Sequence, residues 1–295
     1  MSLPTPVLNQ AHCIVSAVEA GIVKLPTERF IHDGKPGEFV VAPSLSFLLR
    51  HSVTGHKFVF DLGIRKDWTN YPPPTVRKLK ADFRLKVEQD VSESLVKGGL
   101  SPSEVDVVCL SHLHYDHIGD TSRFTNSTFL VGGEAVTLVT PGYPADPKCL
   151  YASDLLPAGR TRFLDMQDQP PLGPFPRAVD FYRDGSLYIV DAPGHSPGHI
   201  NLVVRTSPDG GWLLLAGDSA HHWRLITGES RIAEGPVGFT GTCAHSDKKA
   251  AEEHLERIRA FMRFPKTMVL LAHDEPWYKE NKDGPAFWPG QIPSK

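Results

Sequence analysis

The segment at residues 111–120 reads SHLHYDHIGD and places three histidines and an aspartate within six positions. It follows the apolar, β-branched run at 105–110, which predicts a strand. His112 and His114 are two residues apart in extended chain, so both can bind one ion. Asp116 and His117 come where the chain must turn and can serve a second ion. Imidazoles at this density would repel one another once protonated, and a bound dication removes that conflict. The pattern therefore indicates a metal site rather than solvated loop histidines.

Other metal-binding residue types also stand beside predicted strands. Asp218 follows the apolar run at 212–215, and His273 follows another at 267–271. The turn APGHSPGH holds His195 and His199 and opens a further run. A fold that gathers these strand ends at one edge of its sheets would bring the side chains together. The predicted strands lie at 46–50, 57–60, 105–110, 128–131, 186–190, 200–204, 212–215 and 267–271.

Two segments have the apolar spacing of helices. The first is predicted at 86–97, where Gly98 and Gly99 stop it. The second is predicted at 247–263, with Ser246 as its N-cap. The proline-rich stretch at 140–177 also contains apolar residues, so we interpret it as an ordered excursion rather than a linker. Mixed strands with flanking helices favour a layered α/β (α+β) sandwich, and we expect one domain over residues 1–295.

The composition limits the classes of binding partner and of cellular compartment that we expect for this protein. The formal net charge is -3, so no basic excess points to a nucleic acid or an anionic membrane. No apolar run approaches the length of a membrane span, and residues 1–12 lack the features of a signal peptide. The four cysteines are scattered without CxxC spacing and read as reduced thiols. We expect a cytoplasmic protein that acts on a small molecule.

The ordered set HxHxDH, GHSPGH, GD and LAHD resembles the metallo-β-lactamase superfamily from about residue 45 to residue 273. The resemblance implies a four-layer αβ/βα sandwich with a metal site at one edge. The segment FVFDLG at 58–63 is similar to the family's early strand and Asp-x-Gly turn. Asp61 is then expected to fix a ligand histidine rather than to bind metal itself.

The resemblance also implies a dinuclear ligand set. By that likeness, one ion is bound by His112, His114 and His199, a second by Asp116, His117 and His273, and both by Asp218. His195, in the same turn as His199, is given a structural role. Two zinc ions are expected. Iron or manganese are alternatives, because no thiolate ligand enforces zinc.

Two zinc ions about 3.5–4 Å apart can share a hydroxide and polarise a substrate oxygen. Asp116 can take the proton of the attacking hydroxide and pass it to the leaving group. The expected reaction is therefore hydrolysis. Among the superfamily's branches, the segments FLLRH, FDLG, SHLHYDHIGD and GHSPGHINL resemble the N-acyl homoserine lactonases. The segment at 61–74 looks more like fungal relatives that hydrolyse lactams or lactones.

One position departs from the lactonase pattern. Those enzymes carry a tyrosine three residues after the bridging aspartate, where this chain has His221. An imidazole there can donate to an oxyanion or protonate an amine leaving group, which favours a lactam. The alternative is that His221 merely faces solvent. We expect a lactone or lactam hydrolase. An N-acyl homoserine lactonase, a phosphodiesterase and a non-catalytic metal-binding protein stay open, and the resemblance allows a homodimer.

Overall fold

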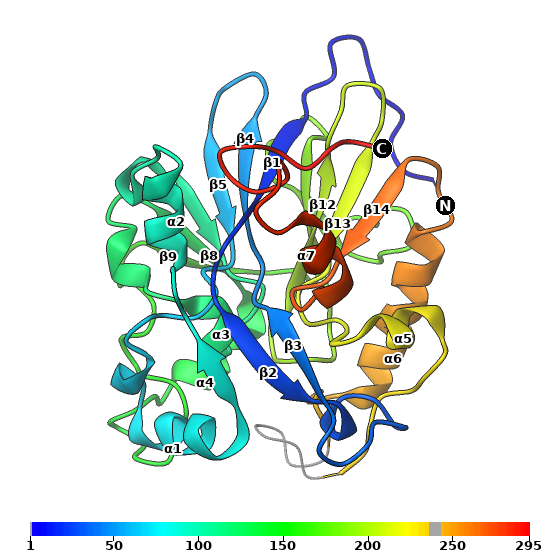
Figure 1. Ribbon diagram of the computed structural model, residues 1–295. Helices are drawn as coiled ribbons and strands as arrows, with labels where there is room; N and C mark the ends of the chain where they lie inside the picture. The colour runs from blue at the N-terminus through cyan, green and yellow to red at the C-terminus, as the bar shows by residue number, and fades with distance from the viewer. Residues whose placement is uncertain (1, 236–242) are drawn as a thin grey trace.

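The computed structural model describes residues 2–235 and 243–295 and contains two large sheets that face each other (Figure 1). In the first sheet, β1, β4 and β5 are antiparallel, whereas β5, β7, β8 and β9 are parallel. Its strands in spatial order are β1 (Cys13–Val18), β4 (Ser46–His51), β5 (Lys57–Phe60), β7 (Val107–Cys109), β8 (Thr128–Gly132) and β9 (Thr161–Leu164).

The second sheet is antiparallel except at one edge, where β13 and β14 run parallel. Its strands in spatial order are β10 (Ala178–Asp180), β11 (Leu187–Asp191), β12 (Ile200–Arg205), β13 (Trp212–Leu215) and β14 (Thr267–Leu270). A third, small sheet has the order β3 (Phe39–Pro43), β2 (Ile22–Pro26) and β6 (Arg84–Lys86).

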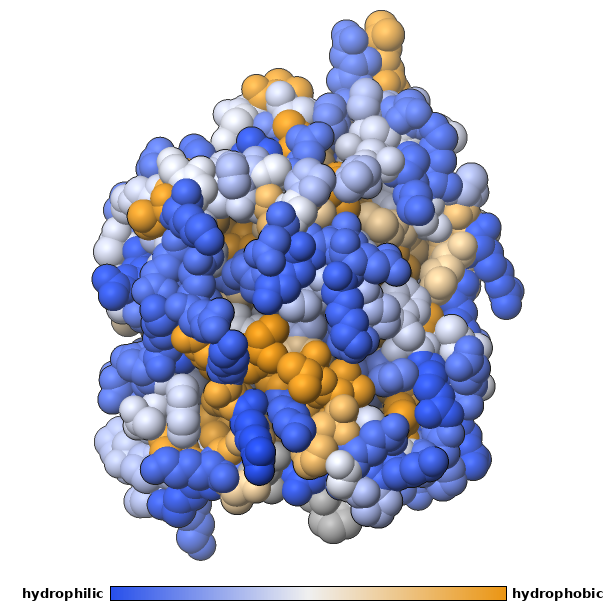
Figure 2. All heavy atoms as spheres, in the orientation of Figure 1, coloured by the Kyte–Doolittle hydropathy of each residue, from blue (hydrophilic) through white to orange (hydrophobic). Residues whose placement is uncertain are grey.

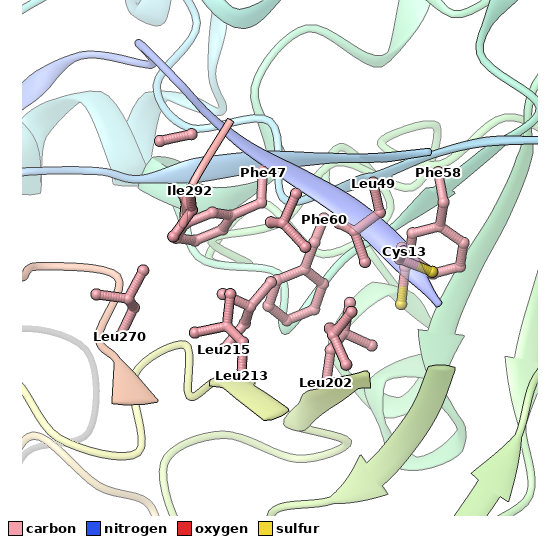
Figure 3. Close-up of a cluster of buried hydrophobic side chains, with 14 of the residues drawn as sticks. Cys13, Phe47, Leu49, Phe58, Phe60, Leu202, Leu213, Leu215, Leu270 and Ile292 are labelled. Atoms are coloured by element: carbon pink, nitrogen blue, oxygen red, sulfur yellow. The ribbon is translucent and has the colours of Figure 1, made fainter. Parts of the chain in front are cut away.

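The two large sheets enclose an apolar core between their inner faces. Phe47, Phe58 and Phe60 project from the first sheet (Figure 3). They meet the inner-face leucines Leu202, Leu213, Leu215 and Leu270 of the second. The alternate residues of the same strands point outward, as the two-residue period of a strand requires. Both faces of these strands are buried, so each sheet needs a covering layer on its outside.

Helices supply those covering layers. Leu79 of α1 (Pro73–Asp82) and Leu95 of α2 (Val91–Lys97) join the buried cluster on the outer face of the first sheet. Four buried side chains of α6 (Lys248–Phe261), together with α5 (Trp223–Thr227), join that of the second. The architecture is thus the predicted αβ/βα sandwich. Shorter helices are α3 (Tyr115–Ile118), α4 (Val136–Val139), α7 (Glu275–Asn281) and the 3-10 turns η1 (Thr27–Arg29), η2 (Trp68–Asn70), η3 (Pro102–Glu104), η4 (Thr121–Arg123) and η5 (Gly133–Ala135).

All eight predicted strands are present, with shifts of at most two residues at either end, but both predicted helices start later than expected. The first begins at Val91, because the Asp90 side chain accepts from the Glu93 backbone N–H and caps it. The residues before it form β6, which pairs with β2. The second begins at Lys248 and is capped by Asp247 rather than by Ser246. Residues 140–177 supply β9, in keeping with an ordered excursion.

Of the helices in residues 2–235 and 243–295, none combines the length and the apolar character that a membrane crossing requires. The expectation of a single domain over the whole chain stays a prediction.

We predict that Phe60→Ala lowers the free energy of unfolding by about 3–5 kcal/mol, because it leaves a cavity between the two sheets. Phe60 is 1% exposed. The control Phe163→Ala removes a ring that is 40% exposed on β9 and should cost less than about 1 kcal/mol. Urea unfolding followed by circular dichroism measures both. Equal losses would show that the space between the sheets is not the main core.

Candidate metal centre

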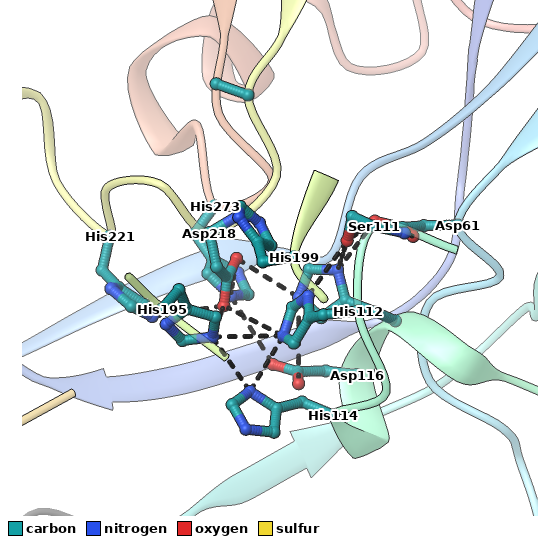
Figure 4. Close-up of polar contacts among 12 residues, drawn as sticks. Asp61, Ser111, His112, His114, Asp116, His195, His199, Asp218, His221 and His273 are labelled. Carbon is teal, nitrogen blue, oxygen red and sulfur yellow. Dashed lines mark hydrogen bonds and ion pairs between the residues drawn. The ribbon is translucent and has the colours of Figure 1, made fainter. Parts of the chain in front are cut away.

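Four chain segments bring polar side chains to one edge of the two sheets (Figure 4). The histidine-rich segment follows β7 and continues into α3, and the turn at 192–199 joins β11 to β12. Asp218 follows β13, and His273 follows β14. Leu215 and Leu270 are paired in the parallel register of those strands, so the residues beyond both strand ends emerge side by side. The sheet register therefore positions residues that are far apart in the sequence.

The first group of ligand-type atoms consists of three imidazoles. His112 Nε2 lies 2.8 Å from His114 Nδ1. His195 Nε2 lies 3.1 Å from the former atom and 3.0 Å from the latter. Zn–N bonds of 2.0–2.1 Å in a tetrahedron place ligand nitrogens about 3.3 Å apart, so this spacing suits one small cation. Asp218 is close enough to complete the group.

The sequence predicted His199 for this group, whereas the structure places His195 beside His112 and His114. The ring of His199 is occupied by backbone at both nitrogens: Nδ1 donates to the carbonyl oxygen of Ala192 at 2.9 Å. Its Nε2 accepts from the backbone N–H of Asp218 at 3.2 Å. A ring with no free lone pair cannot bind a metal. The two histidines share one turn motif, and only the long-range backbone contacts separate them.

The second group consists of Asp116, His117 and His273. His273 Nε2 lies 3.5 Å from Asp116 Oδ2, and His117 Nε2 lies 3.9 Å from Asp116 Oδ1. Asp218 turns its Oδ1 toward this group, at 3.2 Å from His117 Nε2 and 3.4 Å from His273 Nε2. Six of the seven predicted ligand residues therefore converge here, with His195 in the place expected for His199.

Asp218 contacts both groups, one carboxylate oxygen to each. Its Oδ2 lies 3.4 Å from His195 Nε2 and 3.8 Å from His112 Nε2. Its Oδ1 faces the second group. The side chain is 2% exposed, so water does not screen its charge. A carboxylate in this position can bridge two cations.

Hydrogen bonds on the outer side of the rings fix which nitrogen faces the centre. His117 Nδ1 donates to Asp61 Oδ2 at 2.8 Å, and His273 Nδ1 donates to the carbonyl oxygen of Pro43 at 2.8 Å. The hydroxyl of Ser111 donates to Asp61 Oδ2, which leaves it free to accept from His112 Nδ1 at 3.0 Å. Each ring therefore turns an Nε2 lone pair inward. The expectation that Asp61 supports a ligand histidine agrees with this geometry.

The inward Nε2 lone pairs and the oxygens of the buried Asp218 carboxylate are all hydrogen-bond acceptors, and they face one another. Among the described residues, His117 Nε2 and Asp218 Oδ1 have no hydrogen-bond partner. Buried acceptors without donors are costly, and cations relieve that cost. The nitrogen and oxygen donor set suits zinc, and it suits iron or manganese as well. The residues present thus fit two metal ions.

Protons compete with metal ions for the same lone pairs. Burial opposes the charged form of His117, but the carboxylates of Asp218 and Asp61 outweigh it and raise its pKa well above the usual value. For His273, burial likewise opposes the charged form, but the Asp218 carboxylate outweighs this effect and raises the pKa. Burial lowers the pKa of His112, which is surrounded by other imidazoles. The centre is therefore arranged to attract positive charge toward Asp218.

His221 lies beside the first group and does not face solvent, since it is 6% exposed. Its Nε2 is 3.2 Å from Asp218 Oδ2. Its ring packs on Phe30 with centroids 4.5 Å apart. A further buried imidazole, His245, lies 5.4 Å from His221 between ring centroids. His245 was not among the predicted site residues, because it stands outside every recognised motif.

An apolar wall borders the histidines on one side. Phe30 belongs to a buried cluster built on the small sheet, with Val23, Leu25, Ala42, Ile64 and Ala244. Phe39 and Val41 are exposed on β3, and Figure 2 shows an apolar area over β2 and β3. A molecule that approaches the centre past this sheet meets apolar surface.

We predict that Asp61→Asn weakens metal binding by about 10–100-fold, because Asn cannot match the charge that orients His117. Competition with a chromophoric chelator measures the affinity. Asp106→Asn is the control: this carboxylate accepts from the Lys57 backbone N–H, away from the cluster. An unchanged affinity in Asp61→Asn would contradict the supporting role of Asp61.

His195 and His199 are separable by metal content. We expect His195→Ala to lower bound metal per chain after dialysis, because it removes an inward nitrogen. His199→Gln should keep the metal and lower the melting temperature, because its ring bonds only to backbone. Elemental analysis and thermal denaturation give the two readouts. The reverse pattern would restore the original prediction.

Comparison with known proteins bears on this fold and cluster. A sequence model described as the metallo-beta-lactamase superfamily matches residues 40–273. The chain is 30% identical over 317 residues to the cytochrome P450 monooxygenase mpaDE of Penicillium roqueforti, covering 97% of this chain and 36% of that protein. It is 38% identical over 170 residues to Gamma-lactamase MBL2 of Gibberella moniliformis, covering 56% of this chain and 70% of that relative. Of several curated relatives, mpaDE among them, the chain spans only 30% to 50% of the length.

The fold also matches a solved structure, a B. thuringiensis AiiA variant with N-decanoyl-L-homoserine bound at its active site. The TM-score is 0.71 at 19% identity, and the match covers 99% of this chain and 100% of that one. At this identity the likeness concerns the fold. Since the superfamily model covers most of the chain and the sandwich agrees with it, the protein belongs to the metallo-beta-lactamase superfamily.

Proposed function

We propose that this protein is a dinuclear metal-dependent hydrolase that opens a cyclic amide or ester, a lactam before a lactone. The observation that carries the proposal is Asp218, whose two oxygens face two separate groups of inward nitrogens and carboxylate oxygens. One ion would be held by His112, His114 and His195, and a second by Asp116, His117 and His273. Zinc is the favoured metal, with iron or manganese as alternatives.

Bound zinc would supply a hydroxide near neutral pH and a Lewis acid for the substrate oxygen. The chain's own residues orient the ligand rings and exclude bulk water. Asp61, Ser111 and the Pro43 carbonyl keep the inward rings in one tautomer. The centre is buried, so bulk water does not compete for the polar contacts made there.

Asp116 is suited to move a proton. Burial raises the pKa of its carboxyl, against the pull of His117 and His273. A carboxylate with a raised pKa accepts a proton more readily than an exposed one. Asp116 can therefore take the proton of the attacking hydroxide and deliver it to the heteroatom of the opened ring. Its nearest polar neighbours belong to the second group, which supports a proton transfer on that side.

His221 serves the opposite end of the scissile unit. It contacts Asp218 Oδ2, the oxygen that faces the first group. An N–H in this position can bond to the carbonyl oxygen of the substrate as that oxygen gains negative charge. The contact with Phe30 holds the ring in place.

The choice of a ring amide is supported by the relative named as a gamma-lactamase. The AiiA structure, which holds N-decanoyl-L-homoserine, supports the second candidate, an N-acyl homoserine lactone. The apolar wall of the small sheet suits a ring with an aromatic or acyl substituent. A cytoplasmic location and a homodimer stay predictions.

We predict that the purified protein hydrolyses at least one member of a panel of γ-lactams, benzoxazolinones and acyl homoserine lactones. Asp218→Ala should lower kcat/KM on the best substrate by more than about 100-fold. This loss is larger than that expected when a residue that only hydrogen-bonds to a metal ligand is removed. The control Asp209→Ala removes an exposed carboxylate paired with Lys266 and should leave the rate unchanged. Mass spectrometry of the ring-opened product reports turnover. A rate in Asp218→Ala equal to that of the parent would refute the mechanism, and turnover of bis-p-nitrophenyl phosphate alone would replace it with phosphodiester hydrolysis.

A further inference from the structure

His245 is buried without a partner. Its side chain is 1% exposed, and neither ring nitrogen has a hydrogen-bond partner among the described residues. Two other buried imidazoles have at least one hydrogen-bond partner: His254 Nε2 lies 2.8 Å from Asn201 Oδ1, and His199 is bonded at both nitrogens. A neutral imidazole carries one donor and one acceptor, and leaving both unpaired is costly. His245 is therefore expected to find its partner in something that enters the site.

The ring points at the metal centre. One nitrogen of His245 lies within 4.8 Å of a nitrogen of His195 and of one of His221. The ring centroids are 5.3 Å apart for His245 and His195, and 5.0 Å apart for His195 and His221. Three imidazoles from three separate loops thus converge next to the Asp218 carboxylate.

The loop that carries His245 is fixed to the turn that carries His195. The Ser246 backbone N–H donates to the His195 carbonyl oxygen at 3.0 Å, and the Asp247 N–H donates to that of Gly194 at 2.9 Å. Gly194 has φ +127°, and a Cβ there would lie 2.3 Å from the backbone nitrogen of Ala251 in α6. Only glycine permits this close approach. The position of His245 relative to the centre is therefore set by backbone contacts rather than by a mobile side chain.

The side of the centre on which His245 lies suggests its role. The oxygen of Asp218 that contacts His221 also faces His195, whereas its other oxygen faces His117 and His273. Asp116 belongs to that second side. In a cyclic amide or ester, the carbonyl oxygen and the ring heteroatom are two different substituents of the reacting carbon and point in different directions. With Asp116 on the heteroatom, the imidazole pair is left with the carbonyl oxygen.

We propose that His245 is a catalytic residue, which together with His221 donates a hydrogen bond to the carbonyl oxygen of the substrate ring. This inference rests on the proposed function. When hydroxide adds to the carbonyl carbon, the π electron pair moves to the oxygen, and the two N–H groups bond to it without giving up their protons. The ring bond then breaks, and its electron pair leaves with the heteroatom. That atom takes the hydroxide proton through Asp116, so the products are a carboxylate and an N–H or O–H.

A third metal ion at the three imidazoles is the competing interpretation. His195 would then be shared with the first ion, and the three imidazoles add no negative charge. Three dications within a few ångströms around the few carboxylates of this centre would repel one another strongly. A neutral hydrogen-bond donor has no such cost. The donor role therefore agrees better with the charges present.

The test uses His245→Phe, which keeps a ring against His195 and His221 and removes the N–H. On the best ring substrate, kcat should fall by about 100-fold with KM little changed, because the bond forms only as the oxygen gains charge. His245→Gln, which retains an N–H donor, should recover part of the loss. Metal per chain should stay at the parent value. Loss of one metal equivalent in His245→Phe would overturn the proposal in favour of a cation site.

The matched control is His254→Phe, which alters another buried imidazole near α6. Its partner is Asn201, so it should lower the melting temperature and leave kcat close to the parent value. If His245→Phe also changed only the melting temperature, the proposal would be wrong.

A binding measurement keeps the inference independent of turnover. A cyclic boronate forms a tetrahedral anion that imitates the adduct of hydroxide with a ring carbonyl. Its affinity for metal-loaded protein, measured by calorimetry, should fall at least about tenfold in His245→Phe and not in His254→Phe. If the parent opens no ring but the boronate shows this difference, the proposed substrate class fails and the role of His245 stands. Equal boronate affinities in parent and His245→Phe would overturn that role.

Discussion

The Asp218 carboxylate is the contact on which the site depends. Five imidazoles approach its two oxygens within 3.2–3.8 Å, and all of them are buried. Their residues are His112, His117, His195, His221 and His273. A buried carboxylate among lone pairs is stable only when positive charge joins it, as protons or as metal ions. The rest of the fold places these groups together, because no short segment of chain could supply them all.

Hydrogen bonds to backbone atoms orient several of the buried imidazole rings. The carbonyls of Ala192 and Pro43 accept from His199 and His273, and the N–H of Asp218 donates to the other nitrogen of His199. The last contact needs the turn at Gly217, where a Cβ would lie 2.8 Å from His199 Nε2. His199 thereby fixes the start of the Asp218 loop. Its two ring nitrogens are bonded to backbone, so the proposed metal set has His195 in its place.

The features that depend on local sequence pattern, such as the long strands and the motif histidines, were predicted. The features that depend on contacts between distant segments were missed. Apolar runs located eight of the strands, and six of the seven residues that motif order predicted as ligands lie in the two groups. Six of the described strands were missed. β2, β3 and β6 form a small separate sheet, and β1, β9 and β10 lie at the edges of the two large sheets. His195 and His199 were exchanged, since their spacing in GHSPGH is the same and only their contacts with other loops differ. His245 lies in no motif, so the sequence offered nothing to find it by.

The histidines of this centre differ in the hydrogen-bond partners of their ring nitrogens, and we relate their proposed roles to that difference. Where a carboxylate, hydroxyl or carbonyl takes the outer N–H, as in His117, His112 and His273, the inner lone pair is free for a cation. Where backbone takes both nitrogens, as in His199, the ring is structural. Where neither nitrogen has a hydrogen-bond partner in residues 2–235 and 243–295, as in His245, the ring can donate to a bound molecule. The same residue type is therefore suited to support a neighbour, to bind a cation or to donate to a substrate, according to the hydrogen bonds that the fold supplies to each ring.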